Sequence, residues 1–202
     1  FYEDQILFYM KNFAKEFASD LVNLFFPLQC LGCNTPLTPH EKDICVHCQL
    51  QLPFTYFHLD GNNPMVQKLN ALLKIEAATA LCYFEKNSIL ERMLYQLKYS
   101  GQQQLGAYFG SLMGELLKHI KDFQNVQAVI PVPLHSRRRR ERGYNQATLF
   151  GSVIAQHLGV PFVEGLLLRT RNTKQLAKTK DDRNAVLKNA FELNLKKNNP
   201  KH

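Results

Sequence analysis

Apolar side chains recur at helical spacing near the start of the chain. Residues 1–26 repeat apolar positions at three- and four-residue steps, which predicts an amphipathic helix that ends before Pro27. A helix so rich in phenylalanine could lie on a membrane or on a partner protein. Its polar face is not basic, however, which favours packing on its own domain.

Further along, short apolar runs alternate with periodic segments. The runs predict strands over residues 79–84, 126–132 and 160–168. The periodic segments predict helices over residues 88–98, 105–120 and 147–158. The first of these helices opens with a capping box of Ser88 and Glu91. Because a strand, a helix and a strand follow one another through short links, we expect a parallel α/β unit that binds ligands at the carboxyl ends of its strands.

Four cysteines form two Cys-x-x-Cys pairs separated by a short loop. The pairs are Cys30 with Cys33 and Cys45 with Cys48. Two such pairs can direct four thiolates at one point, which predicts a tetrahedral zinc site that holds the fold and leaves no open position for catalysis. Soft sulfur ligands favour zinc over magnesium or calcium. His40 or His47 could replace one cysteine as a ligand.

Two other interpretations of the cysteines are less favoured. Disulfides do not suit a chain without a secretion signal, and a redox pair would not need a second copy nearby. Cys82 stands alone in an apolar run and is expected to be a small buried hydrophobic residue. The fold class is therefore α/β, with a parallel sheet flanked by helices and preceded by an amphipathic helix and a small four-cysteine element resembling a zinc ribbon.

Composition adds an excess of positive charge to this picture. The chain has 202 residues, of which 45% are hydrophobic and 21% charged, as in one medium globular domain with a small appendage. Its net charge is +8, and nearly all of the excess lies in the second half. This predicts an anionic partner such as phosphate, pyrophosphate or nucleic acid, with a solvated basic face as the alternative. The sequence shows neither a membrane-length apolar run nor a signal pattern, so we expect a cytoplasmic protein.

The densest positive charge lies in residues 130–147, which are expected to form the loop after the second predicted strand. Two prolines fix the backbone as it leaves the strand, and five arginines follow: Arg137, Arg138, Arg139, Arg140 and Arg142. A guanidinium fork can donate two hydrogen bonds to phosphate oxygens, but not all five can face one ligand, and Glu141 is expected to hold one of them. The step into the next helix adds backbone N–H groups and consists of Gly143, Tyr144 and Asn145. An anion site is thus predicted, with a solvated charge run as the alternative.

Taken in order, these features resemble the ComF family, competence-associated proteins that join a four-cysteine zinc element to a phosphoribosyltransferase-like domain. The resemblance covers nearly all of the chain from about Leu21. Besides the cysteine pairs, it rests on residues 97–101 (LKYSG), 131–135 (PVPLH), 142–146 (RGYNQ) and 169–175, and on Arg183 and Phe191.

The resemblance implies three parts and a ligand. The parts are a helix over residues 1–28, the zinc element over 29–60 and a phosphoribosyltransferase-like domain over 61–202. The implied ligand is phosphoribosyl diphosphate with Mg²⁺, whose pyrophosphate Lys98 and the arginines would contact while an acceptor displaces it at the ribose carbon. Lys98 could instead be a solvated lysine at a helix C-terminus.

The resemblance also implies a role in DNA uptake during natural transformation. Other competence proteins would be partners and could bring the protein to the inner face of the membrane. The alternative to a transferase is a module without catalysis that handles single-stranded DNA on the same anion-binding surface. Unpaired bases would suit the aromatic residues near the basic side chains, for which core packing is the other interpretation: Tyr99, Tyr108 and Tyr144.

Some family features are missing. The phosphoribosyl-diphosphate loop of the family would begin just after His202, so we expect this sequence to be a fragment that is inactive as a transferase alone. Val186 stands where the family usually has asparagine, and the spacing from Thr173 to Gln175 is one residue tighter than usual. The contacts of residues 171–189 therefore stay open.

Overall fold

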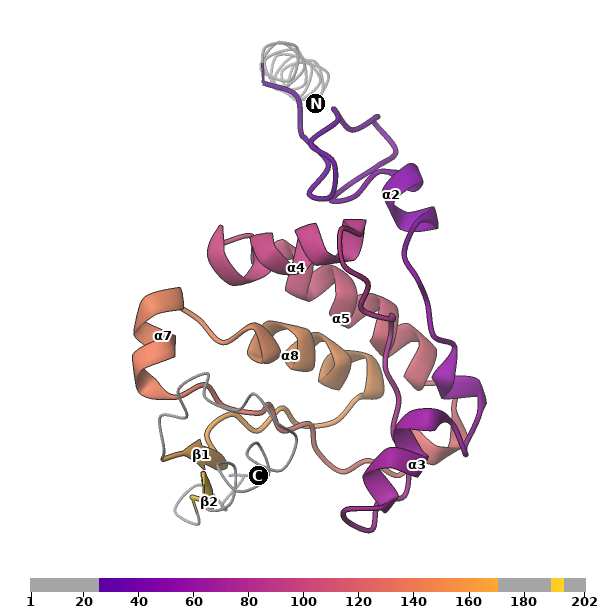
Figure 1. The fold of residues 1–202 in the computed structure, drawn as a ribbon, viewed down its shortest axis with the longest axis vertical. Coiled ribbons are helices and arrows are strands. Elements are labelled where there is room, and N and C mark those ends of the chain that lie inside the picture. Colours follow the sequence, from indigo (N-terminus) through magenta and orange to yellow (C-terminus); the bar gives the residue numbers. More distant parts are fainter. Residues whose placement is uncertain (1–25, 171–189, 195–202) are drawn as a thin grey trace, which may run out of the picture. The chain divides into compact units, whose positions relative to one another are not determined.

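The computed structural model describes residues 26–170 and 190–194 (Figure 1). The chain divides into two compact units, residues 1–52 and 53–202, and each is described by itself. The amphipathic helix predicted before Pro27 and the segment 171–189 fall outside the described residues. The domain boundaries expected after residues 28 and 60 stay predictions.

In the first unit, a tight turn holds the first cysteine pair. The backbone N–H of Cys30 donates to the carbonyl of Thr35 (2.9 Å), and the N–H of Asn34 donates to the carbonyl of Cys30 (2.8 Å). Asn34 has φ 61°, in the left-handed region that asparagine adopts more readily than most residues. The second pair lies at the start of α2 (Val46–Leu50), which the Cys45 side chain caps by accepting from the N–H of Cys48.

Apolar burial in this first unit is small. Apart from cysteines, the buried apolar side chains in its described part are those of Ile44 and Leu52, which are 6% and 5% exposed. A core of this size contributes a few kcal/mol at most, because a fully buried aliphatic side chain contributes about 1.5–3 kcal/mol. We therefore expect the cysteines to supply most of the cohesion of its described part, residues 26–52.

The described part of the second unit is mainly helical. Its elements in chain order are η1 (Phe57–Leu59), α3 (Pro64–Asn70), α4 (Ile89–Tyr99), α5 (Gln104–Leu117), α6 (Lys121–Gln124), α7 (Ser136–Arg142), α8 (Gln146–Leu158), β1 (Leu167–Arg169) and β2 (Phe191–Leu193). Helices α4, α5 and α8 confirm the three helices predicted from apolar spacing in this part of the chain. The capping box forms as well: the Ser88 hydroxyl accepts from the N–H of Glu91 (3.2 Å), and the Glu91 carboxylate accepts from the N–H of Asn87 (2.7 Å).

Helix α5 packs on both α4 and α8 (Figure 1), and glycines on α5 let α8 approach closely. A Cβ atom at Gly110 would lie 2.7 Å from the carbonyl oxygen of Phe150, and one at Gly114 would lie 2.7 Å from Cβ of His157. One turn earlier, Gly106 faces Leu149. Because contacts advance in the same direction along both helices, α5 and α8 are parallel and their N-termini lie at the same end.

A hydrophobic core cluster joins α5 and α8. Met113 and Leu117 of α5 pack with Ile154 of α8, and Val129 and Phe150 lie against them. Met113, Leu117, Phe150 and Ile154 are apolar positions that the helical spacing predicted, whereas Val129 comes from a run that was predicted as a strand.

The glycine face gives a first testable prediction. Gly110→Ala should lower the free energy of unfolding by about 3 kcal/mol, because the new methyl group meets a backbone carbonyl that has no rotamer to adopt. Gly106→Ala is the matched control. Its Cβ would lie 3.4 Å from the Leu149 side chain, so crowding is small and is offset by a gain in helix propensity of about 1 kcal/mol. Urea denaturation followed by circular dichroism measures both, and equal effects would contradict the close approach at Gly110.

The parallel sheet expected from the three apolar runs is not formed as a sheet in the described residues. The sheet that is present pairs β1 with β2, antiparallel, with Leu168 opposite Glu192. The run 79–84 makes an isolated antiparallel bridge between Phe54 and Cys82. The other two runs meet in a single parallel bridge, Val129 with Phe162.

Prolines explain why this parallel bridge does not extend. Val129 donates to the carbonyl of Pro161 and accepts from the N–H of Val163, both at 2.9 Å. In a parallel ladder the next donors would be residue 131 on one side and residue 161 on the other. Both are prolines and have no N–H, so the ladder stops in each direction.

Asn63 organises the connection before α3. Its side chain is only 2% exposed. The amide nitrogen donates to the carbonyls of Phe57 (3.0 Å), Asp60 (2.9 Å) and Ala78 (2.8 Å). The amide oxygen caps α3 by accepting from the N–H groups of its first turn at 2.9 and 3.1 Å. One side chain thus joins three segments of the second unit.

Candidate functional site

The structure brings the four predicted metal-ligating cysteines together. Their Sγ atoms all lie within 4.8 Å of one another, which could hold a metal ion such as zinc. Backbone N–H groups point at the sulfurs: Gly32 and Cys45 donate to Sγ of Cys30 at 3.3 and 3.2 Å. None of the described cysteines forms a disulfide bond.

The two histidines considered as substitute ligands are not in this group. His47 Nε2 lies 2.8 Å from the side-chain amide nitrogen of Gln51, one turn along α2, and His40 is exposed. Within the described part of the chain, the ligand group therefore contains sulfur only.

The protonation of the thiols differs within the cluster. Hydrogen bonds with the side chain and backbone of Thr35 lower the pKa of Cys33 to about 6. Burial raises the pKa of Cys45 and of Cys48. A bound cation would offset this desolvation, because metal coordination stabilises the thiolate form.

A second site, here called the cationic pocket, lies in the second unit. It is a cavity of about 490 Å³ lined by Lys98 and Tyr99 from the end of α4 and by Arg138, Glu141 and Arg142 of α7. Arg138 and Arg142 are four residues apart and share one face of α7, and both are partly buried, as is Lys98. Three cations against one carboxylate leave the pocket positive.

Arg142 is held in place by its neighbours. Its Nη1 donates to Oε1 of Gln146 (3.1 Å), and its guanidinium carbon lies 5.3 Å from the centre of the Tyr99 ring. Close by, the hydroxyl of Tyr144 donates to the carbonyl of Leu97. Burial raises the pKa of Tyr144, so this hydroxyl stays protonated as a donor. These contacts tie the end of α4 to the junction of α7 and α8.

The other arginines of the run point elsewhere. Arg137, Arg139 and Arg140 are exposed and do not line the pocket. Arg137 is bonded to Glu141 (3.0 Å), which confirms that Glu141 holds one arginine.

The run also forms a helix, α7, where the sequence predicted a loop. His135 caps this helix by accepting from the N–H of Arg137 (3.3 Å), and Gly143 ends it with φ 77°.

At the step after Gly143, the backbone N–H groups of Gly143 and Ala147 are bonded within the chain, and free donors between them stay a prediction. The N–H of Gly143 donates to Arg139, and the side chain of Asn145 accepts from the N–H of Ala147 (3.2 Å). Asn145 is buried, and its amide nitrogen donates to the carbonyl of Val132 (3.0 Å). This residue therefore fixes α8 to the proline segment and positions the pocket indirectly.

Arg169 of β1 was not anticipated as a neighbour of the pocket arginines. Burial, and then the charge of Arg138, lower the pKa of Arg169. The guanidinium also lies 5.5 Å from the Phe191 ring. In the sequence, Arg169 is only a basic residue after an apolar run. Its proximity to Arg138 arises from the tertiary fold, so the sequence pattern does not predict it.

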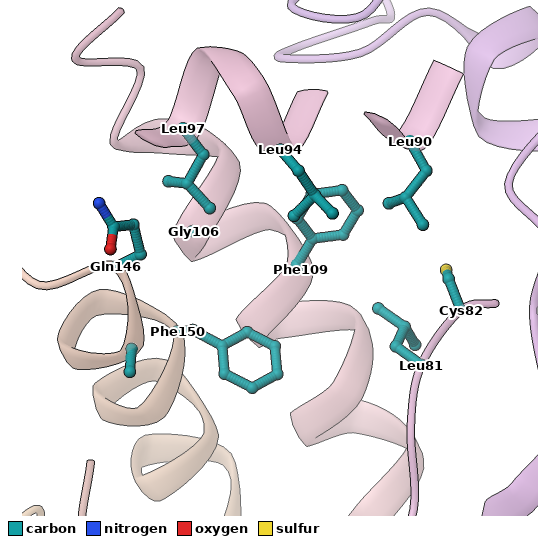
Figure 2. Close-up of a pocket in the computed structure, with 10 residues that line it drawn as sticks. Leu81, Cys82, Leu90, Leu94, Leu97, Gly106, Phe109, Gln146 and Phe150 are labelled. Carbon is teal, nitrogen blue, oxygen red and sulfur yellow. The ribbon is translucent and has the colours of Figure 1, made fainter. Parts of the chain in front are cut away.

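An apolar cavity of about 310 Å³ lies between α4, α5 and α8 (Figure 2). Phe109, Phe150 and Gln146 are among the residues that line it, and Gln146 also accepts from Arg142. Cys82 lies at its edge, partly buried, and burial raises the pKa of this thiol to about 11. The thiol is thus protonated at neutral pH, in keeping with the hydrophobic role expected for Cys82.

Within the described ranges, none of the helices is both long enough and apolar enough to cross a membrane.

The candidate sites are thus a four-cysteine cluster in the first unit and a cationic pocket in the second. The chain is 29% identical to Competence protein F of Haemophilus influenzae over 186 residues, which cover 86% of this chain and 80% of that protein. It is 28% identical to the DNA utilization protein YhgH of Escherichia coli O157:H7 over 188 residues, 85% of this chain and 80% of that protein. These similarities support the assignment of the chain to the ComF family. No family model and no solved structure matches it.

Proposed function

We propose that this protein acts in the uptake or use of DNA and that its cationic pocket binds phosphate groups of the ligand. The relatives named for competence and for DNA utilization support the process. The observation that carries the binding site is the convergence of Lys98 with Arg138 and Arg142. These residues come from two helices far apart in the sequence and share one cavity.

The chemistry of the pocket suits phosphate. Arginine forks donate paired hydrogen bonds to phosphate oxygens, and a lysine adds a point charge. Arg138 also lies near the cationic Arg169, an unfavourable pairing that a bound anion would relieve. The exposed arginines Arg137, Arg139 and Arg140 would add long-range attraction for a polyanion.

For the four-cysteine cluster we propose one structural zinc ion. Four thiolates complete a tetrahedral shell, so the ion would hold the first unit together and would not bind substrate.

A second candidate ligand is phosphoribosyl diphosphate with Mg²⁺. The supporting observation is the parallel bridge between Val129 and Phe162, with α7 and α8 between its two sides. This is the strand-helix-strand order of a phosphate-binding α/β unit, and the pocket follows its first side. Lys98, Arg138 and Arg142 would bind the leaving pyrophosphate, and Gly143, Tyr144 and Asn145 would shape the site. Phosphoribosyl transfer would be the reaction if the protein is an enzyme.

Charge removal tests the pocket. Lys98→Gln and Arg138→Gln should each weaken binding of a thymidine oligonucleotide several-fold and lower the slope of log affinity against log salt by about one. Fluorescence anisotropy at several salt concentrations measures both quantities.

Lys121→Gln is the matched control, because it removes the same charge from α6, which does not line the pocket. An equal loss in the control would show that only net charge matters and would contradict the pocket. Inorganic pyrophosphate should compete with the oligonucleotide. If phosphoribosyl diphosphate with Mg²⁺ competes no better than pyrophosphate, the second candidate ligand is wrong.

A further inference from the structure

We infer that Tyr95 and Tyr99 form a stacking platform for an unpaired nucleobase whose phosphate lies in the cationic pocket. This inference rests on the proposed function, since it takes the phosphate from that site. It adds a binding site for the nucleobase, which the charged side chains of the pocket do not bind.

The two tyrosines lie side by side on the outer face of α4. They are four residues apart, and their ring centres are 5.0 Å apart with the planes at 43°. The opposite face of the helix carries its buried residues, including Met93 and Leu97. Helix periodicity therefore turns both rings outward, and they are 61% and 63% exposed.

Two large exposed aromatic side chains on a polar helix face call for an explanation beyond packing. A single exposed apolar residue is ordinary, whereas an adjacent pair of rings makes a continuous apolar surface. In binding sites for single-stranded nucleic acid, such rings stack on bases next to a basic groove.

The pair is continuous with the cationic pocket. Tyr99 lines the pocket itself, and its hydroxyl lies 3.5 Å from Nη2 of Arg142. The Arg142 guanidinium lies over the Tyr99 ring at 5.3 Å, an arrangement that limits the motion of both groups. A nucleotide carries its base and phosphate on one sugar, so adjacent aromatic and cationic groups can bind both at once. Duplex DNA keeps its bases paired and cannot use the rings in this way.

The test separates bases from phosphates. We compare a thymidine oligonucleotide with an abasic oligonucleotide of the same length and charge, using fluorescence anisotropy on the full chain. The unaltered protein should bind the thymidine oligonucleotide more tightly. Tyr95→Leu should weaken that binding about tenfold, in the range measured for loss of one stacked base, and should leave abasic binding unchanged.

Tyr95 is the better position to change, because Tyr99 also contacts Arg142. Tyr95→Phe should retain full affinity, since stacking does not need the hydroxyl. Tyr83→Leu is the control at another exposed tyrosine (50%), and it should have no effect. Thermal unfolding of each variant checks that α4 is intact. If one nucleotide fills the site, Tyr95→Leu should also weaken the binding of thymidine monophosphate. If Tyr95→Leu weakens only the binding of the oligonucleotide, the platform needs a base within a longer strand.

The outcomes distinguish this inference from the function on which it rests. Equal affinity for both oligonucleotides, with loss on Lys98→Gln, would overturn the platform and leave the phosphate pocket standing. The same conclusion follows if Tyr95→Leu binds the thymidine oligonucleotide as tightly as the unaltered protein. Binding of neither oligonucleotide would overturn the proposed function and the platform together.

Discussion

Replacing Cys48 with serine should abolish zinc binding and unfold the described part of the first unit. The apolar core there consists of little more than Ile44 and Leu52, so we expect the proposed zinc ion to supply most of the folding free energy. Structural zinc sites contribute on the order of 10 kcal/mol, far more than such a core can replace. Metal analysis of the unaltered protein should return one zinc per chain, and the variant should be metal-free and sensitive to protease before residue 53.

Cys82→Ser is the control for this experiment. It removes a thiol of the second unit that belongs to no ligand group among the described residues. Zinc content should stay at one per chain, and protease resistance should be unchanged. Adding a chelator to the unaltered protein should have the same effect as Cys48→Ser. Acid should do the same, because protons compete with the metal for the thiolates. A metal-free first unit that resists protease would refute the zinc site.

Asn63→Ala should lower the free energy of unfolding of the second unit by about 4 kcal/mol. About 1 kcal/mol of this is the lost helix cap of α3. The rest arises because the carbonyls of Phe57, Asp60 and Ala78 lose their donor, and an unsatisfied buried polar group costs about 1–3 kcal/mol. Urea denaturation measures the change.

Two further variants separate these contributions. Asn63→Asp keeps the oxygen that caps α3 but loses the amide N–H donors. Its destabilisation should therefore be well above the roughly 1 kcal/mol expected for loss of the cap alone. Asn62→Ala changes the exposed neighbour and should alter stability by less than about 0.5 kcal/mol. Equal effects at both positions would show that the connection before α3 does not depend on the buried amide.

The sequence predicted those parts of the fold that depend on local pattern. Helices α4, α5 and α8 each carry an apolar face that packs on the core, and this leaves a period in the sequence. Helix α7 has no such face, because it is almost wholly arginine. Without an apolar period, the run was predicted as a loop. The helix is instead limited by the His135 cap at its start and by Gly143 at its end.

Strand prediction failed for a different reason. The apolar runs were expected to be buried strands, but several of their large side chains are exposed, among them Phe84, Ile130 and Val132. A ladder also needs donors at alternate positions. Pro131 and Pro161 remove them on both sides of the one parallel bridge. Asn63 was missed because it sits among turn-forming residues, where one buried amide looks like any other polar residue.

The candidate site shows the same division. Two Cys-x-x-Cys pairs are a local signal, and the prediction that their sulfurs meet is confirmed. Lys98 and Arg142 were named as anion ligands, a role that stays a prediction. Their convergence depends on the parallel register of α5 and α8, which the glycine contacts set, and no local pattern contains that information. Tyr95 gave no signal, because an isolated tyrosine in a helix is usually a packing residue.

The parallel register has an electrostatic consequence for any experiment on the pocket. Each α-helix carries about half an elementary positive charge at its N-terminus. In α5 and α8 these ends lie side by side, and α8 begins with Gln146, which is bonded to Arg142. The C-terminal ends of α4 and α7 carry the opposite partial charge and also reach the pocket, through Lys98 and Arg142. The two backbone contributions oppose each other, so the positive potential of the pocket depends on its side chains. Neutralising the arginines of α7 should therefore remove most of its affinity for anions.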